Sequence, residues 1–333
     1  MSSSPIKFPS PVGGVPFSHD FDPSIVFIVF FALCLPVAVY RLMNQQRRTY
    51  IIISVMFFCI ERVINFSLRA AEARSPVKRT ERFYVTYLQG AYGTGFIGLG
   101  QALTVILRAY LVYTTRGEVA VGGKAAPFAL SSRSDTRLPL TEEYAISSDA
   151  GVFQPLPMSP MEDDPDRRMQ IRRLLRIISF VYWVAVILSA VSGGLYWSGI
   201  TDSNKGKLVQ QTRYASTIIV LLQLQATNAI AIWAWKTRPR SVQSSRVLLI
   251  SFFISILSIV AMYRLAVMAN ETTALLSTTR ASLNMPSEKT AFYVLHIAPE
   301  GLVAVALLLL DMKGLFCMGM KGDTALNDNV QSQ

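Results

Sequence analysis

Seven long apolar runs, separated by shorter polar and charged stretches, dominate the sequence. A helix rises about 1.5 Å per residue, so roughly 20 residues cross the hydrocarbon core of a bilayer, and each run has about this length. The pattern predicts an all-α fold: a polytopic membrane protein built as a bundle of seven transmembrane helices. The predicted spans are Ser24–Tyr40, Thr49–Leu68, Phe83–Leu107, Ile177–Ile200, Tyr214–Trp235, Val247–Ala269 and Thr290–Leu310.

The polar stretches divide the chain into five parts. Residues 1–21 are rich in Pro, Ser and Gly and predict a disordered N-terminal tail. Residues 22–113 hold transmembrane helices 1–3, and residues 172–311 hold helices 4–7. Between them, residues 114–171 are rich in Ser, Pro and Arg and lack helical periodicity, which predicts a long disordered cytoplasmic loop. Residues 312–333 predict a cytoplasmic tail.

Composition and charge agree with this class of protein. Of the 333 residues, 51% are hydrophobic, and the net charge is +11. The Lys and Arg residues lie mostly at the ends of the apolar runs, which is typical of membrane anchoring and argues against a nucleic-acid partner. Only 2 His residues are present, too few for metal sites that need several imidazole ligands. We therefore expect no metal and no cofactor.

The last apolar run carries the most unusual polar residues. Glu300 lies near its middle, where an isolated charge costs several kcal/mol, so other helices must shield this side chain from lipid. His296 precedes Glu300 by four residues and therefore shares its helical face. Pro299 removes a backbone N–H and predicts a kink beside both.

Three more charged residues fall within predicted spans at a similar depth. Glu61 and Arg62 lie in the second run, and Arg264 lies near the end of the sixth. One interpretation is that the arginines extend to the nearer interface; the other is that they line the bundle interior. We hypothesise that Glu300 pairs with Arg264 or Arg62, with His296 as a neighbour. This network is either the lining of an outward-opening pocket or a purely structural lock.

Uncharged polar and small residues predict further contacts between helices. Gln101 is expected to line the interior, and Gln225 and Asn228 share a face that is expected to form interhelical hydrogen bonds. Glycines crowd the third run, where they favour close helix packing, with a ligand cleft as the alternative. They are Gly90, Gly93, Gly95, Gly98 and Gly100.

Positive charge sets the expected orientation. The excess of Lys and Arg beside the long loop and the C-terminal tail predicts an N-terminus outside and a C-terminus in the cytoplasm, in the plasma membrane or else in an endomembrane or vacuolar membrane. Asn270 begins an Asn-Glu-Thr sequence that matches a glycosylation site. The 114–171 loop has Ser residues that suit phosphorylation and a cytoplasmic signalling partner, and its basic end suits membrane lipids.

Several motifs resemble those of fungal membrane proteins. They are CIERVINFSLRAAE in the second run, LRAYLVYTTRG after the third, AMYRLAV in the sixth, and EKTAFYVLHIAPEGLVAVALLLLDMKGLF at the end. Together they resemble a fungal seven-helix family of unknown function and, more distantly, the RTA-like lipid-translocating exporters. The resemblance implies that Arg264, Tyr293 and Glu300 occupy recurring polar positions of these families.

Two functions agree with these features. Seven spans, an outside N-terminus, an outer polar pocket and a long basic loop favour a receptor-like sensor with an amphiphilic small-molecule ligand. The resemblance and the ionisable residues within the spans favour a lipid or amphiphile translocator that confers tolerance to membrane-active compounds. Ser198 with His296 gives only a weak indication of an enzyme, because Ser198 lies at the end of a span, so we expect a non-enzymatic protein.

Overall fold

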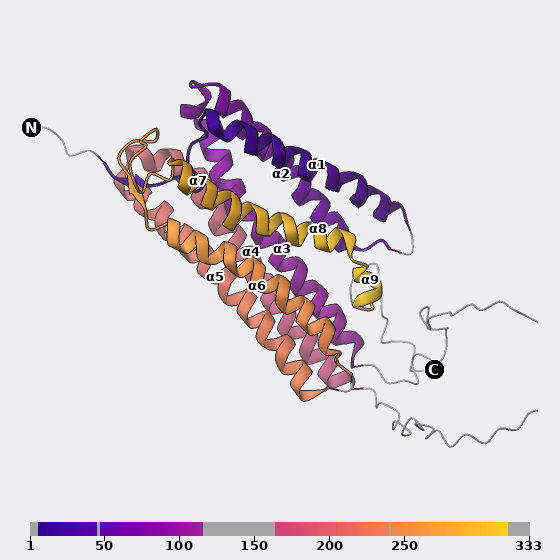
Figure 1. The fold of residues 1–333 in the computed structure, drawn as a ribbon. Helices are drawn as coiled ribbons and strands as arrows, with labels where there is room; N and C mark the ends of the chain where they lie inside the picture. The colour runs from indigo at the N-terminus through magenta and orange to yellow at the C-terminus, as the bar shows by residue number, and fades with distance from the viewer. Residues whose placement is uncertain (1–5, 45–46, 116–163, 240, 319–333) are drawn as a thin grey trace, which may run out of the picture.

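The computed structural model describes residues 6–44, 47–115, 164–239 and 241–318. Within them, seven helical segments are long and apolar enough to cross a membrane, which confirms the predicted all-α bundle. Five are single helices, the first joins the short 3-10 helix Ser18–Asp20 to α1, and the seventh joins α7, a π-helical turn and α8 (Figure 1). The helices are α1 (Phe21–Met43), α2 (Tyr50–Arg74), α3 (Arg82–Tyr113), α4 (Pro165–Thr201), α5 (Ser203–Thr237), α6 (Ser244–Val267), α7 (Pro286–Phe292), the π-helical turn (Tyr293–Ile297), α8 (Ala298–Leu309) and the short α9 (Met312–Leu315).

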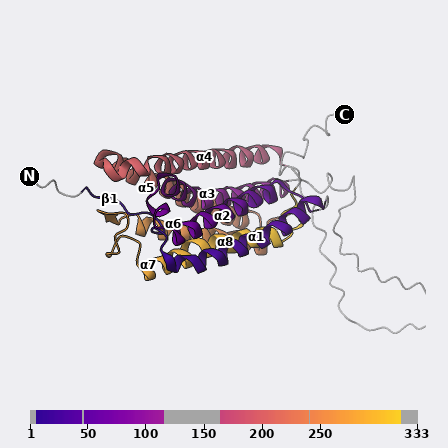
Figure 2. The same ribbon diagram turned by 90° about the horizontal axis from the view of Figure 1, so that it is seen from above.

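Helix α3 is the central element of the bundle. Within its apolar window 78% of the residues are buried, against 22% for α1 and α4, because α3 contacts α2, α4, α5, α6 and α8. Helices α1 and α2 pack on each other, and α4 packs between α3 and α5. Figure 2 shows α4 along one side of the bundle and α1 with α8 along the opposite side.

Two helices extend well beyond their predicted spans. Helix α4 begins at Pro165, because Asp164 caps it by accepting a hydrogen bond from the Arg167 backbone N–H at 3.0 Å. The basic residues placed at the end of the 114–171 loop are therefore helical from residue 165, and that boundary is wrong. Helix α5 begins at Ser203, capped in the same way by Asp202. The rest of the predicted loop, residues 116–163, and most of the predicted C-terminal tail lie outside the described residues.

The prediction of a disordered tail is wrong for residues 6–21. Strand β1 (Phe8–Pro9) pairs antiparallel with β2 (Glu271–Thr272), and the short 3-10 helix Ser18–Asp20 leads directly into α1. Val12 and Val15 are buried beside this strand. The segment crosses the end of the bundle nearest α7, opposite the end at which α9 lies (Figures 1 and 2). Its Pro and Gly residues prevent long regular elements, but apolar anchors and distant polar side chains hold it in place.

Glycines let α3 and α4 approach closely. A Cβ atom at Gly193 would lie 2.6 Å from the Cα of Gly90, so the backbones of α3 and α4 are in direct contact where the helices cross. A Cβ atom at Gly93 would lie 1.9 Å from the Ser189 hydroxyl. At these positions the glycines serve close helix packing.

This crossing gives a direct prediction. We expect Gly193→Ala to lower the free energy of unfolding by about 1–3 kcal/mol, because rigid backbone must move to admit the methyl group. Gly194→Ala is the matched control, since nothing lies within 4 Å of a Cβ at the adjacent position. Unfolding of the reconstituted protein by a denaturing detergent measures both. Equal losses for the two variants would contradict the proposed backbone contact.

Candidate functional site

Two facing stripes of polar residues build the interior of the bundle. On α2, Arg62 and Arg69 are seven residues apart and share one face. On the seventh span, the spacing 289, 293, 296 and 300 also follows one helical face. The two stripes run antiparallel, so Arg62 meets Glu300 near the middle of the spans and Arg69 meets Tyr293 near one end.

The central cluster consists of Arg62, His296 and Glu300, all fully buried. Arg62 Nη2 lies 2.7 Å from Glu300 Oε2, and His296 Nε2 lies 3.3 Å from Glu300 Oε1. The Arg62 guanidinium also lies over the Phe58 ring, 5.0 Å from its centroid. Of the two predicted partners of Glu300, Arg62 is therefore the one in contact, and the carboxylate faces the bundle interior.

A glycine on α3 makes room for this arginine. A Cβ atom at Gly95 would lie 1.8 Å from Arg62 Nη2, so no larger residue fits here without moving the guanidinium. The guanidinium therefore comes from α2, the space for it from the missing side chain of Gly95 on α3, and the carboxylate from α8.

The central cluster is incompletely hydrogen-bonded. Within the described part of the chain, seven buried nitrogen and oxygen atoms of Arg62, His296 and Glu300 have no hydrogen-bond partner. The ion pair is close in distance, but its groups are not aligned for a hydrogen bond. A buried polar network in this state is held by charge and burial more than by directional hydrogen bonds.

The other predicted members occupy the edge of this cluster. Glu61 is partly exposed, and its Oε2 lies 3.6 Å from Arg62 Nη1. Arg264 is buried, but its Nη1 donates to the Tyr92 carbonyl at 2.6 Å and its Nε donates to the Thr217 hydroxyl at 3.4 Å. The predicted alternative pair between Arg264 and Glu300 is therefore wrong, because the Arg264 guanidinium donates to the Tyr92 carbonyl and the Thr217 hydroxyl instead. The side chains of Arg62 and Arg264 are buried in the bundle, in agreement with the second of the two interpretations.

The uncharged residues of the predicted site do not join the central cluster. Gln225 Nε2 donates to the Ser258 hydroxyl at 2.9 Å and links α5 to α6. Asn228 is half-buried, and its Oδ1 has no partner within the described residues. Gln101 is half-buried and has no hydrogen bond to another described residue. Asn270 is half-buried beside β2, and its glycosylation stays a prediction.

A second cluster, not predicted as a site, lies at the end of the bundle under the N-terminal segment. We call it the mouth cluster: Asp20, Arg69, Lys289 and Tyr293, all buried. Asp20 Oδ1 accepts from Arg69 Nη2 at 2.9 Å and from the Tyr293 hydroxyl at 3.1 Å. Asp20 Oδ2 accepts from Lys289 Nζ and, at 2.8 Å, from the Phe17 backbone N–H. This carboxylate has donors on both oxygens, in contrast to Glu300.

The spacing of Lys289 and Tyr293 before His296 could have revealed part of the mouth cluster. Arg69 lies seven residues after Arg62 and points to the same face. Asp20 carried no such signal, because it lies in a segment whose composition is typical of disorder.

Tyr92 of α3 connects the two clusters. Its hydroxyl accepts from Arg69 Nη1 at 3.4 Å in the mouth cluster. Its ring centroid lies 6.0 Å from the Arg62 guanidinium and 6.2 Å from the His296 ring in the central cluster. The seventh span is a second connection, because its π-helical turn, Tyr293–Ile297, includes one residue of each cluster. Such turns are frequent at functional sites.

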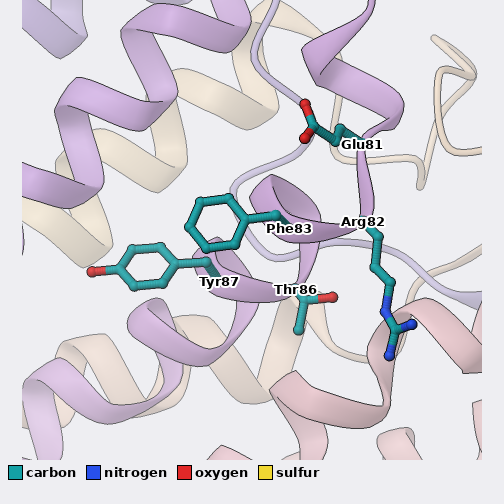
Figure 3. Close-up of a pocket in the computed structure, with 5 residues that line it drawn as sticks. All are labelled: Glu81, Arg82, Phe83, Thr86 and Tyr87. Atoms are coloured by element: carbon teal, nitrogen blue, oxygen red, sulfur yellow. The ribbon is translucent and has the colours of Figure 1, made fainter.

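An open surface pocket has a lining that includes no residue of either cluster. It has a volume of about 600 Å³ and is lined by residues at the start of α3 (Figure 3). These residues are Glu81, Arg82, Phe83, Thr86 and Tyr87. The Glu300 carboxylate is fully buried and the N-terminal segment lies across the mouth, so the outward-opening pocket beside Glu300 stays a prediction.

The fold and the two buried clusters define the class of the protein: a seven-helix, multi-pass membrane protein with an ionic interior. Comparison of the chain with protein-family models, curated proteins and solved structures finds no match.

Proposed function

We propose that the protein is a non-enzymatic, receptor-like sensor of the plasma membrane, in which the seventh span transmits changes at the mouth cluster to the central cluster. One observation carries this proposal: a fully hydrogen-bonded ionic cluster and an incompletely hydrogen-bonded one share the seventh span, and its π-helical turn includes one residue of each. A change at Lys289 or Tyr293 would rotate or shift the segment that carries Glu300.

The energetics of buried charges support a switching role. A buried ion pair contributes little net stability, because desolvation offsets much of the attraction between the charges. The Arg62–Glu300 pair also leaves several polar atoms without partners, which adds to its cost. Because the pair adds little net stability, the seventh span can have two conformations of similar free energy. In this proposal the mouth faces outward, and the 114–171 loop and the C-terminal tail face a cytoplasmic partner.

A lipid or amphiphile translocator is the second candidate. The observation that favours it is the surface pocket at the start of α3, whose lining combines the stacked Phe83 and Tyr87 rings with the charged residues Glu81 and Arg82 (Figure 3). The same face of α3 continues as half-exposed residues past Gly98, where a Cβ atom would meet open space. The sequence resemblance to lipid-translocating exporters also favours this candidate.

Glu300→Gln separates the two functions, because it keeps the shape of the side chain and removes its charge. In cells that lack the endogenous protein, we expect the variant to abolish the transcriptional response to membrane-active compounds without lowering growth in their presence. In proteoliposomes, we expect no lipid translocation above background for either the wild-type or the variant protein, measured with a fluorescent lipid and a membrane-impermeant quencher.

Glu61→Gln is the matched control for this experiment. It removes a carboxylate of the same depth that lies 3.6 Å from Arg62 but leaves the Arg62–Glu300 contact in place, so its effect should be smaller. Rapid lipid translocation by the wild-type protein that Glu300→Gln abolishes would reject the sensor and favour the translocator.

A further inference from the structure

The N-terminal segment is bound to the bundle through its main chain. Five of its carbonyl groups accept hydrogen bonds from side chains that belong to five different helices. The donors and acceptors are Tyr196 to Pro9 (2.8 Å), Arg213 to Ser10 (3.2 Å), Gln89 to Val12 (3.3 Å), Arg69 to Gly13 (2.7 Å) and Lys289 to Val15 (2.6 Å).

Main-chain N–H groups of the segment are recognised as well. The Val12 N–H donates to Gln89 Oε1 at 3.0 Å, so one side chain binds both main-chain groups of Val12. The Val15 N–H donates to Asn284 Oδ1 at 2.7 Å. The pairing of β1 with β2 adds backbone contacts at the start of the segment. This is how proteins recognise extended peptides: main-chain bonds provide affinity, and a few side chains provide specificity.

An acidic side chain ends the segment. Asp20 places its carboxylate between Arg69 and Lys289, and the Lys289 ammonium also lies 4.6 Å from the centre of the Phe17 ring. The helices of the bundle thus place two cations, Arg69 and Lys289, beside the carboxylate of the segment. The groups that bind the segment, including Arg69, Arg213 and Lys289, belong to the helices of the bundle and would face any other occupant of the mouth.

We propose that the mouth of the bundle is a binding site for an extended acidic peptide, and that residues 8–20 of the chain occupy it as a tethered ligand. This inference deepens the proposed sensor, on which it rests, by naming the ligand class. A tethered segment has an effective concentration in the millimolar range, so a free peptide binds only when the segment is loosened or when the peptide is abundant.

A single glycine allows the segment to be loosened without changing any charge. Gly14 has a φ of +64°, and a Cβ atom there would lie 2.1 Å from the Leu283 carbonyl oxygen and 2.7 Å from Asn284 Oδ1. We therefore expect Gly14→Ala in the full chain to prevent the segment from binding at the mouth of the bundle. The probe is a fluorescent synthetic peptide with the sequence of residues 6–20, and the measurement is fluorescence anisotropy with the protein in nanodiscs.

We expect saturable binding of this peptide to the Gly14→Ala chain, at least about tenfold tighter than to the unsubstituted chain. A peptide with Asp20→Asn should bind about tenfold more weakly or worse, and a peptide with Gly14→Ala should not bind. A Gly14→Ala chain that is folded but does not bind the unsubstituted peptide would overturn the proposal. The segment would then serve only to stabilise the fold.

A reversible lock tests the same site should Gly14→Ala fail to fold. Phe8 and Thr272 are paired across β1 and β2, so Phe8→Cys with Thr272→Cys is suited to forming a disulfide that holds the segment in place. At millimolar peptide, we expect binding to the reduced chain and none to the oxidised chain. Equal binding in both states would overturn the proposal. These assays use purified protein, so their failure leaves the Glu300→Gln test of signalling unaffected.

Discussion

Replacement of Arg69 by methionine is expected to lower the free energy of unfolding by about 3–5 kcal/mol, because it breaks a buried ion pair and leaves several buried acceptors without their donor. Arg69 is fully buried and donates to Asp20, to Tyr293 and to the Gly13 carbonyl. Its loss leaves the Asp20 carboxylate paired with Lys289, and with His19 at 3.7 Å, within the described residues. It also removes the hydrogen bonds from α2 to Gly13 and Asp20 of the N-terminal segment.

Arg74→Met is the matched control for this prediction. Arg74 lies near the end of the same helix, but it is exposed, and its guanidinium lies over the Phe21 ring at 3.8 Å. Loss of an exposed cation–π contact costs about 0.5–1 kcal/mol. Unfolding of both variants by a denaturing detergent in bicelles provides the comparison. A loss for Arg69→Met no larger than that for Arg74→Met would contradict the buried mouth cluster.

Replacement of Arg62 by methionine is expected to cost a similar amount, about 3–5 kcal/mol, because Glu300 is then buried beside His296 alone. A second change should reverse most of this loss. In the Arg62→Met chain, Glu300→Gln replaces the uncompensated carboxylate with a neutral amide, which needs no counter-charge.

The double variant therefore serves as the internal control for Arg62. We expect the chain with both changes to be more stable than the chain with Arg62→Met alone, by the same unfolding measurement. If the two losses simply add, the Arg62 guanidinium and the Glu300 carboxylate do not depend on each other, and the pair seen in the structure does not form in the membrane.

The bundle could be predicted from the sequence because the bilayer imposes a length and a composition on each span. The helix ends could not be predicted in this way, since hydropathy does not detect helix that continues beyond the apolar core. Helix α4 is the clearest case: Asp164 and Pro165 are a recognisable start signal, but it lies twelve residues before the predicted span, Ile177–Ile200. The N-terminal segment was missed because the contacts that hold it are with residues 49 to 274 positions away, which composition does not detect.

The central cluster could be predicted in part. The four-residue spacing of His296 and Glu300 and the cost of a charge in lipid required a shielded acidic face. The choice between Arg62 and Arg264 could not be made, because sequence gives the depth of a residue in a span but not the direction its helix faces. Tyr92 had no signal at all, since one tyrosine among many aromatic residues looks like ordinary core.

The sensor account holds that the two clusters act as one unit, and a double-mutant cycle between them tests this most directly. The variants are Arg69→Met in the mouth cluster and Glu300→Gln in the central cluster, alone and combined, with the free energy of unfolding as the measured quantity. Coupling through Tyr92 and the seventh span predicts an interaction energy of about 0.5–3 kcal/mol. Additive losses within about 0.3–0.5 kcal/mol would show two independent clusters and contradict the account.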